Sequence, residues 1–157
     1  MDSDTFRSVL GRFASGVTVL TTRDAEGNDR GMTVSAFCSV SLEPPLVLAC
    51  IDRSAEMFPL LAPGLHVVFN VLSSPQEALS RRFSELEGSR RFEGIGFSRD
   101  VRGIPVLDDV LAWLQCEITA ACEGGDHGIF IARVDDAAWE ESRPLLYYRG
   151  GYAQLER

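Results

Sequence analysis

Short apolar segments separated by short polar turns run through most of this sequence and constrain its fold more than any other feature. Residues 17–22 are apolar and β-branched, and a polar turn at 24–28 leads to a second strand-like segment at 31–40, which together predict a hairpin. Residues 84–110 are mixed, polar and rich in glycine and arginine, and look like an excursion over the surface. Further strand-like segments occupy residues 46–51, 65–72, 111–122, 128–139 and 145–148. Six or seven strands joined by short turns favour an antiparallel β-barrel over a parallel α/β sheet.

Two or three short helices are expected around this barrel, so the fold class is mainly β with peripheral helices. The first helix begins with Ser3 or Asp4 as its N-cap and ends by Gly16, because hydroxyl and carboxylate side chains cap helices and glycine terminates them. Its apolar face, at helical spacing, is formed by Phe6, Val9, Leu10 and Phe13. A second helix begins at Ser54, and a third runs from Pro75 to about Phe83, with proline early and acid in its first turn.

Length and charge narrow the class of protein. A chain of 157 residues fits one domain, residues 1–157, with a core large enough to stand alone. Its net charge of −8 opposes nucleic-acid binding, and no stretch gathers the cations that neutralising phosphates would need. No apolar run approaches the roughly 20 residues of a membrane helix, and the acidic start, residues 1–4, is wrong for a signal peptide. We therefore expect a cytoplasmic protein that binds neither nucleic acid nor membrane.

The cysteines and histidines do not form the spacing of a metal site. The two histidines are isolated and no C-x-x-C occurs, so a cluster of closely spaced ligands is not expected. All four cysteines lie within apolar or strand-like segments, at positions 38, 50, 116 and 122. In a reducing compartment they are most simply small hydrophobic core residues.

Several nucleotide and catalytic motifs are missing. The chain has no G-x-x-x-x-G-K-[ST] phosphate loop and no G-x-S-x-G nucleophile elbow. Gly94 and Gly96 begin like a dinucleotide fingerprint, but position 99 is arginine, no strand precedes the segment and no helix follows it. A Rossmann domain is therefore rejected.

The segment Arg30–Phe37 is the densest in potential chemistry. In a strand, Thr33 and Ser35 project to one face. The other face carries Met32, Val34 and Ala36. Glycine at position 31 would let a ligand approach the backbone. Spacing alone favours a half-exposed strand whose hydroxyls face water, with a ligand-binding strand as the alternative.

Many short blocks in the same order give the chain a nearly end-to-end resemblance to a known family. They are residues 6–7, 11–22, 31–37, 39–42, 44–47, 69–72, 76, 80–83, 125–127 and 144–152. The sequence resembles the flavin reductase family of the FMN-binding split-barrel fold, an antiparallel, Greek-key type of barrel. Its members are small NAD(P)H-dependent reductases that serve two-component flavin monooxygenases.

This resemblance implies a flavin pocket and assigns residues to it. Residues 33–36 would line the isoalloxazine ring with hydrogen-bond donors at its polar edge, and Cys50 to Asp52 would form another wall. The cofactor-binding residues implied in this way are Met32, Thr33, Val34, Ser35, Ala36, Cys50, Asp52, Ser54, Asn70, Ser80, Arg82, Phe83, His127 and Tyr152.

The flavin phosphate would lie at the helix expected to begin at Ser54, because a helix N-terminus offers free N–H groups and a positive dipole end. The family often carries a second hydroxyl residue just after this serine, but Ala55 and Glu56 stand here instead. Arg82 could supply the positive charge. Plain helix capping for Ser54 and a solvated helix face for Arg82 are the alternatives.

The resemblance also assigns roles to two further polar residues, Asn70 and His127. Asn70 interrupts an otherwise apolar strand, so it contacts either backbone groups or the flavin's ribityl or ring edge. His127, which follows Asp126, would lie at the mouth of the pocket and contact the nicotinamide, which makes it the one residue assigned to catalysis. By itself it could equally be a turn residue at a hairpin tip, and Asp126 could orient the ring or only stabilise the turn.

The function implied is hydride transfer from NADH or NADPH to FMN or FAD. The same resemblance implies a homodimer with the flavin near the subunit interface, and a separate oxygenase that receives the reduced flavin. One rival is a flavin-binding or carrier protein of the same fold without turnover. A second is an oxidase of the pyridoxine-phosphate type, whose distinctive motifs are not found.

Overall fold

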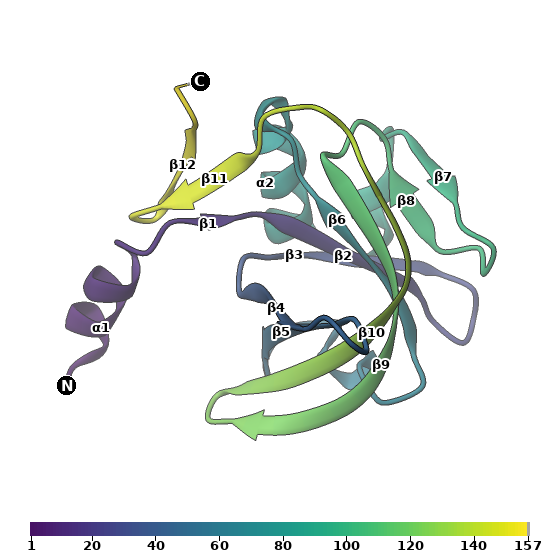
Figure 1. The fold of residues 1–157 in the computed structure, drawn as a ribbon, viewed down its shortest axis with the longest axis horizontal. Coiled ribbons are helices and arrows are strands. Elements are labelled where there is room, and N and C mark those ends of the chain that lie inside the picture. The colour runs from purple at the N-terminus through teal and green to yellow at the C-terminus, as the bar shows by residue number, and fades with distance from the viewer. Residues whose placement is uncertain (157) are drawn as a thin grey trace.

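A computed structural model describes residues 1–156 of the chain as two α-helices, three short 3-10 helices and twelve strands (Figure 1). The helices are α1 (Ser3–Leu10), α2 (Glu77–Glu85) and the 3-10 turns Phe58–Leu60, Ser74–Gln76 and Gly88–Phe92. The strands are β1 (Ser15–Gly16), β2 (Thr18–Arg23), β3 (Asp29–Val34), β4 (Phe37–Ser41), β5 (Leu46–Asp52), β6 (His66–Val71), β7 (Phe97–Arg99), β8 (Pro105–Leu107), β9 (Ala112–Gly124), β10 (His127–Trp139), β11 (Leu145–Tyr148) and β12 (Gly151–Gln154). Neither α-helix of this part of the chain is long and apolar enough to cross a membrane.

Seven antiparallel strands in the order β3-β2-β6-β9-β10-β5-β4 form the main sheet. Its two edge strands, β3 and β4, are consecutive in the chain and separated only by Ser35 and Ala36. The sheet therefore curves until its edges approach each other, which encloses one hydrophobic core. Every strand of the sheet except β4 contributes buried side chains to this core, among them Leu20, Val34, Ile51, Phe69, Cys116 and Phe130.

A second core lies outside the barrel, where α2 packs against β2 and β3. Phe83 of α2 is fully buried there and meets Phe92 edge to face, with ring centroids 5.0 Å apart. A Cβ at Gly31 of β3 would lie 2.7 Å from the Phe83 ring. Glycine at position 31 is thus required for the close approach of this helix to the sheet.

A small three-stranded sheet, β1-β11-β12, stands at one side of the barrel. Figure 1 shows it beyond the β3 and β4 edge, with α1 standing clear of the barrel on the same side. No residue of α1 is buried. The expected N-cap at Ser3 or Asp4 is wrong, because the Asp2 side chain accepts the N–H of Thr5. The helix also ends earlier than Gly16, at Leu10 with Gly11 as its C-cap.

The expected strand at 31–40 is divided in two. The N–H of Phe37 donates to the carbonyl of Ser35 at 3.0 Å, and this tight turn ends β3 before β4 begins. The surface excursion at 84–110 carries a two-stranded sheet of β7 and β8 that the sequence pattern did not indicate. The mainly β class, the β2–β3 hairpin and a helix at α2 are confirmed.

The expectation that all four cysteines are core residues is correct only in part. Cys116 is buried and Cys50 half-buried, whereas Cys38 and Cys122 are exposed. Burial raises the pKa of the Cys116 thiol to about 12 and also raises that of Cys50, and a protonated, buried thiol is a poor nucleophile.

We therefore expect two thiols, Cys38 and Cys122, to react rapidly with Ellman's reagent at pH 8, and Cys116 to react only after unfolding. The time course of thiol release in native buffer and in 6–8 M urea, roughly the range that unfolds small domains, measures this. Rapid release of a third and fourth equivalent without denaturant would contradict the burial of Cys116.

Candidate functional site

Two adjoining hollows form a groove between the barrel edge and the small sheet. Their volumes are about 480 Å³ and about 200 Å³, and Ser35 and Tyr147 line both. The larger hollow is lined by Leu10, Gly11, Phe13, Ser15, Ser35, Ala36, Phe37, Cys38, Leu48, Cys50, Tyr147 and Arg149. The smaller is lined by Val17, Thr33, Ser35, Ser80, Ser84, Tyr147 and Tyr152. Together they have the size of a site for a drug-sized organic molecule. This groove is called the barrel-edge groove below.

The larger hollow is apolar and aromatic with a few hydroxyls. Phe13 from the segment after α1, Phe37 from β4 and Tyr147 from β11 reach it from three directions. Among residues 1–156, no carboxylate lines it, and Arg149 is its one charged lining residue. Such a lining suits a flat aromatic ring system, because rings stack on aromatic side chains and exclude water from them.

The smaller hollow is polar and its hydroxyls are bonded to one another. The Ser80 Oγ and the Tyr152 hydroxyl lie 2.7 Å apart, and Thr33 Oγ1 donates to the Ser80 carbonyl at 2.7 Å. The Arg81 guanidinium lies over the Tyr152 ring, 4.9 Å from its centroid. Tyr152 also meets Tyr147 edge to face, with ring centroids 5.4 Å apart. This network fixes the wall formed by α2, β3 and the small sheet.

His127 lies on the same face of the sheet as the groove wall. In antiparallel pairing, opposed residues share a face, and His127 is opposed to Asp52 while Ile129 is opposed to Cys50. Cys50 lines the larger hollow, and Asp52 and His127 lie two pairs further along the same two strands.

The His127 ring is oriented by its neighbour and is 40% exposed. Its Nδ1 lies 2.7 Å from Asp126 Oδ1, which directs Nε2 away from Asp126. The main chain of this turn is fixed in turn by Arg53, whose N–H donates to the Asp126 carbonyl and whose Nε donates to the Gly125 carbonyl, both at 3.0 Å. Two hydrogen bonds from Ser54 to Asp52 lower the pKa of that carboxyl, and the nearby charge of His127 lowers it further.

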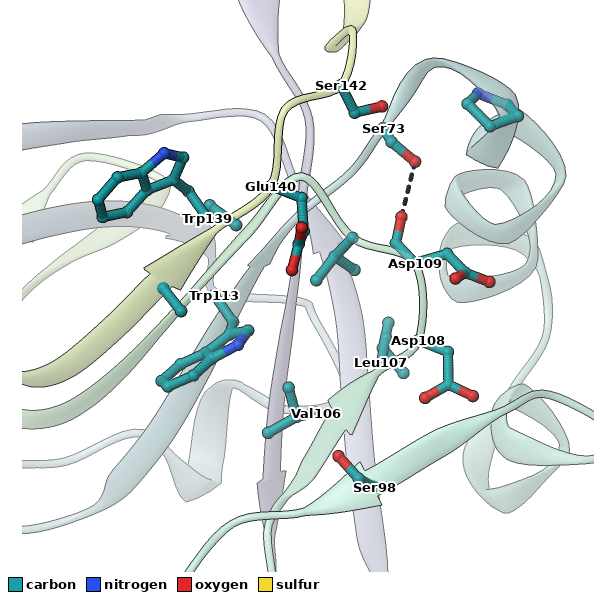
Figure 2. A pocket seen from close by; sticks show the side chains of 14 residues that line it. Ser73, Ser98, Val106, Leu107, Asp108, Asp109, Trp113, Trp139, Glu140 and Ser142 are labelled. Atoms are coloured by element: carbon teal, nitrogen blue, oxygen red, sulfur yellow. Dashed lines mark hydrogen bonds between the residues drawn. The ribbon is translucent and has the colours of Figure 1, made fainter.

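A still larger cavity, of about 540 Å³, lies elsewhere, next to the two tryptophans Trp113 and Trp139 (Figure 2). Figure 2 shows the carboxylates of Asp108, Asp109 and Glu140 around it. None of the sequence-predicted site residues lines this cavity. Three carboxylates disfavour a ligand that carries phosphate, so its chemistry does not suit a nucleotide cofactor.

Comparison with known proteins agrees with this fold and groove. Residues 10–156 match the model of a family described as "Flavin reductase like domain". The chain belongs to this flavin reductase family. The expected split β-barrel is confirmed by its structural neighbours.

Three members of the flavin reductase family show how close the likeness is. The FMN reductase (NADH) SmoA of Agrobacterium fabrum is 38% identical over 156 residues, covering 99% of this chain and 88% of SmoA. HsaB of Rhodococcus jostii, the reductase subunit of a flavin-dependent monooxygenase, is 36% identical over 99% of this chain and 80% of HsaB. The solved structure of the Streptomyces globisporus NADH:FAD oxidoreductase SgcE6 with NAD and FAD fragments gives a TM-score of 0.91 at 34% identity, covering 98% of this chain and 93% of SgcE6.

The structure brings part of the predicted flavin reductase site together. Six of the predicted residues line the barrel-edge groove: Thr33, Ser35, Ala36, Cys50, Ser80 and Tyr152. Asp52 and His127 extend the groove wall along β5 and β10. The side chains of Val34, which is buried, and Met32, which packs on the barrel core, belong to the core cluster, so only their main-chain groups are left for the predicted flavin contact.

The predicted phosphate site at Ser54 is also wrong in its geometry. No helix begins at Ser54, because the next helical element is the three-residue turn Phe58–Leu60, whose N-cap is Met57. The Ser54 hydroxyl instead donates to Asp52 Oδ1 at 2.7 Å. Glu56 forms an ion pair with Arg30 at 3.3 Å. The helix N-terminus on which the phosphate prediction rested is therefore absent from this turn.

Arg82 and Phe83 are structural in this fold. The Arg82 guanidinium donates to the carbonyls of Arg91 at 2.8 Å and Arg90 at 3.0 Å, and to that of Glu93. It therefore fixes the loop after α2, a structural role that uses its Nε and Nη2 donors. Phe83 is fully buried under Gly31, so no ligand can reach its ring.

Asn70 is satisfied entirely by the protein. It is fully buried, and its Nδ2 donates to the Val19 carbonyl at 2.9 Å and to Thr21 Oγ1 at 3.1 Å. Its Oδ1 accepts the N–H of Leu107 at 2.9 Å. The backbone alternative is thus correct, and contact with the flavin is wrong.

The sequence analysis missed the groove residues from the chain's two ends. Leu10 and Phe13 were taken as the core face of a helix, although both are at least half exposed. Tyr147 and Arg149 fell within the family blocks without a role. The sequence did contain an indication of their role. A helix of only eight residues beside an aromatic-rich C-terminal hairpin has little hydrophobic core of its own to pack against.

Proposed function

We propose that this chain is an NADH-dependent flavin reductase that binds FMN or FAD in the barrel-edge groove, with residues 1–157 acting as one domain. The observation that carries the proposal is the groove itself, an aromatic hollow of about 480 Å³ free of carboxylates in a chain of net charge −8. The flavin reductase family and the names of SmoA and SgcE6 support the same activity. NADPH remains an alternative hydride donor for the assay below to compare.

The residues of the groove fit a flavin ring. Phe13 and Tyr147 would stack on it, while Ser35 and the backbone of the turn at Ser35–Phe37 would face its polar edge. When bound, the flavin supplies the hydride acceptor, and fixed donors near its pyrimidine end favour the charge of the reduced ring. The protein's own contribution is to hold two rings in contact and exclude water.

His127 would act as a positioning and binding group for the nicotinamide. With its Nδ1 held by Asp126, the Nε2 atom is directed toward a ligand that enters along β5 and β10. A hydrogen bond to the carboxamide or to a phosphate would orient the donor ring. No proton transfer by His127 is needed for hydride transfer itself.

A homodimer is part of the proposal. The apolar face of α1 is uncovered, with Phe6, Val9 and Leu10 all at least half exposed and Phe13 81% exposed. Such a contiguous apolar face on a helix with no buried residue favours coverage by another protein surface, and a second copy would also close the groove, which Phe13 lines.

A separate oxygenase that receives the reduced flavin in the cytoplasm completes the proposal. HsaB, which is the reductase subunit of a monooxygenase, supports the idea of such a partner.

The test is consumption of NADH by the purified protein. With FMN or FAD present, absorbance at 340 nm should fall, and repeating the assay with NADPH and with riboflavin ranks the donors and flavins. A protein that binds flavin and turns yellow but never consumes either nicotinamide would favour the rival carrier function.

Replacing His127 with alanine should raise the apparent KM for NADH about tenfold and change that for the flavin less than about twofold. One lost hydrogen bond to a ligand corresponds to about 1.4 kcal/mol. Initial rates over a grid of NADH and FMN concentrations measure both constants.

The matched control is His66→Ala, because His66 lies outside the groove and pairs with Glu117 at 3.4 Å. It should leave both constants near those of the unmodified protein. Equal effects of His127→Ala on NADH and flavin, or none, would remove His127 from the nicotinamide site.

A further inference from the structure

Two cysteines line the larger hollow of the barrel-edge groove, Cys38 from β4 and Cys50 from β5. Hydride transfer between two rings needs no thiol, so neither side chain has a part in the proposed reaction. A thiolate is nonetheless one of the strongest nucleophiles in a protein, and it is the group that oxidants attack. Two such groups beside a redox-active ring therefore invite a chemistry of their own.

The strand register makes the two thiols diagonal neighbours on one face of the sheet. Cys38 is opposed to Leu48, and the N–H of Cys50 donates to the Ala36 carbonyl at 2.9 Å. Diagonal neighbours of an antiparallel pair have Cα atoms about 7–8 Å apart, with their Cβ atoms closer. Burial raises the pKa of the Cys50 thiol, and the neighbouring Cys38 raises it further. Both the register and this interaction place the two sulfurs close together.

The two thiols differ in their access to solvent. Cys38 is exposed, whereas Cys50 is half-buried. A small oxidant therefore reaches Cys38 first, while Cys50 remains a protonated thiol. Cysteines that respond to oxidants are typically accessible and adjacent to a second cysteine that reacts with the oxidised sulfur. Cys38 and Cys50 are arranged in this way.

Strand β4 can move the short distance that a bond between the two sulfurs requires. It is an edge strand of the main sheet, and within Phe37–Ser41 no residue is buried. Its pairing with β5 is also irregular, with a register shift between Ser39 and Ser41. A disulfide needs Cα atoms about 4.4–6.8 Å apart. A displacement of β4 by about 1 Å brings diagonal neighbours into this range.

We propose that Cys38 and Cys50 form a reversible disulfide in the presence of hydrogen peroxide, and that this bond weakens flavin binding in the barrel-edge groove. The inference rests on the proposed function for its source of oxidant, because dioxygen that oxidises released, reduced flavin becomes hydrogen peroxide. The bond draws β4 toward β5 across the wall of the ring site. Turnover without an oxygenase to take up the reduced flavin thus switches the reductase off.

Two steps account for the atoms and electrons. The Cys38 thiolate attacks one oxygen of hydrogen peroxide, the O–O bond breaks, and Cys38 becomes a sulfenic acid as hydroxide leaves. The Cys50 sulfur then attacks the Cys38 sulfur, the S–O bond breaks, and the hydroxyl group leaves as water with the proton of Cys50. The hydroxide takes up the proton that Cys38 lost. The two thiols lose two electrons in all, and the peroxide that gains them ends as two molecules of water. A small thiol reverses the bond by exchange.

The test treats the purified protein with hydrogen peroxide in the absence of NADH, after which catalase removes the peroxide. Intact mass should fall by about 2 Da, as two thiols become one disulfide, and peptide mapping should find Cys38 joined to Cys50. The Kd for FMN, measured by quenching of flavin fluorescence, should rise at least about tenfold. Dithiothreitol should restore both the mass and the Kd. Saturating FMN added before the peroxide should slow the formation of the bond, because the ring covers both thiols.

Three serine variants separate the roles of the cysteines, each compared with its own untreated sample. Cys38→Ser should show neither the mass change nor the rise in Kd. In Cys50→Ser the oxidised Cys38 has no partner, so the mass should increase by about 16 or 32 Da instead, for one or two oxygens. The matched control is Cys122→Ser, because Cys122 is exposed and is not among the described residues that line either hollow. It should respond to peroxide as the unmodified protein does. Thermal melting establishes that each variant is folded.

Absence of the Cys38–Cys50 peptide after peroxide treatment overturns the inference, and so does a disulfide that leaves the Kd for FMN unchanged. A disulfide that forms only between two copies of the chain also overturns it. The peroxide in this experiment is added, so the result does not depend on turnover. A protein that forms the bond and loses FMN, yet never oxidises NADH, would refute the reductase function and leave the disulfide and its effect on the groove standing.

Discussion

Replacing Asn70 with alanine should lower the free energy of unfolding by about 3 to 4 kcal/mol, because each buried polar group left unpaired costs about 1–3 kcal/mol. The substitution removes both donors and the acceptor of a fully buried amide. It removes the Asn70 Oδ1 acceptor of the buried Leu107 N–H and the side-chain donor to the Val19 carbonyl. Thr21 Oγ1 keeps its bond to the Pro105 carbonyl at 2.6 Å, so part of the network survives.

Urea denaturation followed by tryptophan fluorescence measures this loss, with Asn28→Ala as the matched control. The Asn28 side chain is exposed and bonds only to Asp24 at 3.3 Å, so its loss should cost less than about 1 kcal/mol. Under conditions where Asn70→Ala is folded, its FMN affinity should equal that of the unmodified protein. Unchanged stability together with weakened FMN binding would return Asn70 to the flavin site.

Asn70 also shows how much a local sequence pattern can predict about a side chain's partners. An amide in an apolar strand must be hydrogen-bonded, and that much follows from its neighbours. The choice between backbone and ligand does not, because the acceptor's partner is the N–H of Leu107, 37 residues later. Long-range partners depend on strand order, which local periodicity does not encode.

The strands also differ in how well the local sequence pattern predicts them. Long, strongly β-branched segments such as β2 and β6 were predicted because their periodicity and composition agree. The three-residue strands β7 and β8 were not, because three residues are too short to show a period. The break between β3 and β4 was missed because side-chain alternation continues across the turn at Ser35.

The candidate site was predictable where a residue's neighbours determine its environment. Thr33 was expected on the face opposite Val34, and it lies there, bound to the Ser80 carbonyl. The role of Arg82 was not predictable, because its guanidinium donates to main-chain carbonyls of the loop after α2. The contact between the two ends of the chain was not predictable, since Gly11 and Arg149 are far apart in sequence and meet through a main-chain hydrogen bond.

Replacing Ala36 with tryptophan should weaken FMN binding at least tenfold, about 1.4 kcal/mol, and reduce NADH oxidation at low flavin concentrations in proportion. Ala36 is exposed and lines the larger hollow of the barrel-edge groove, so an indole there would occupy the space of the ring. The main-chain bond from the Cys50 N–H to the Ala36 carbonyl, 2.9 Å long, does not depend on the side chain. The free energy of unfolding should therefore change by less than about 0.5 kcal/mol, as for most surface substitutions.

The matched control is Ser142→Trp, which places the same bulk in the acidic cavity of Figure 2. Fluorescence titration with FMN and a thermal melt, applied to both variants, separate a blocked site from a misfolded protein. We expect the Ser142 variant to bind FMN normally. The reverse result would place the flavin beside Trp113 among three carboxylates, where repulsion of its phosphate would have to be offset by groups that line the cavity, and neither a lysine nor an arginine is among them. The barrel-edge groove avoids this repulsion, since none of the residues from 1–156 that line its larger hollow carries a carboxylate.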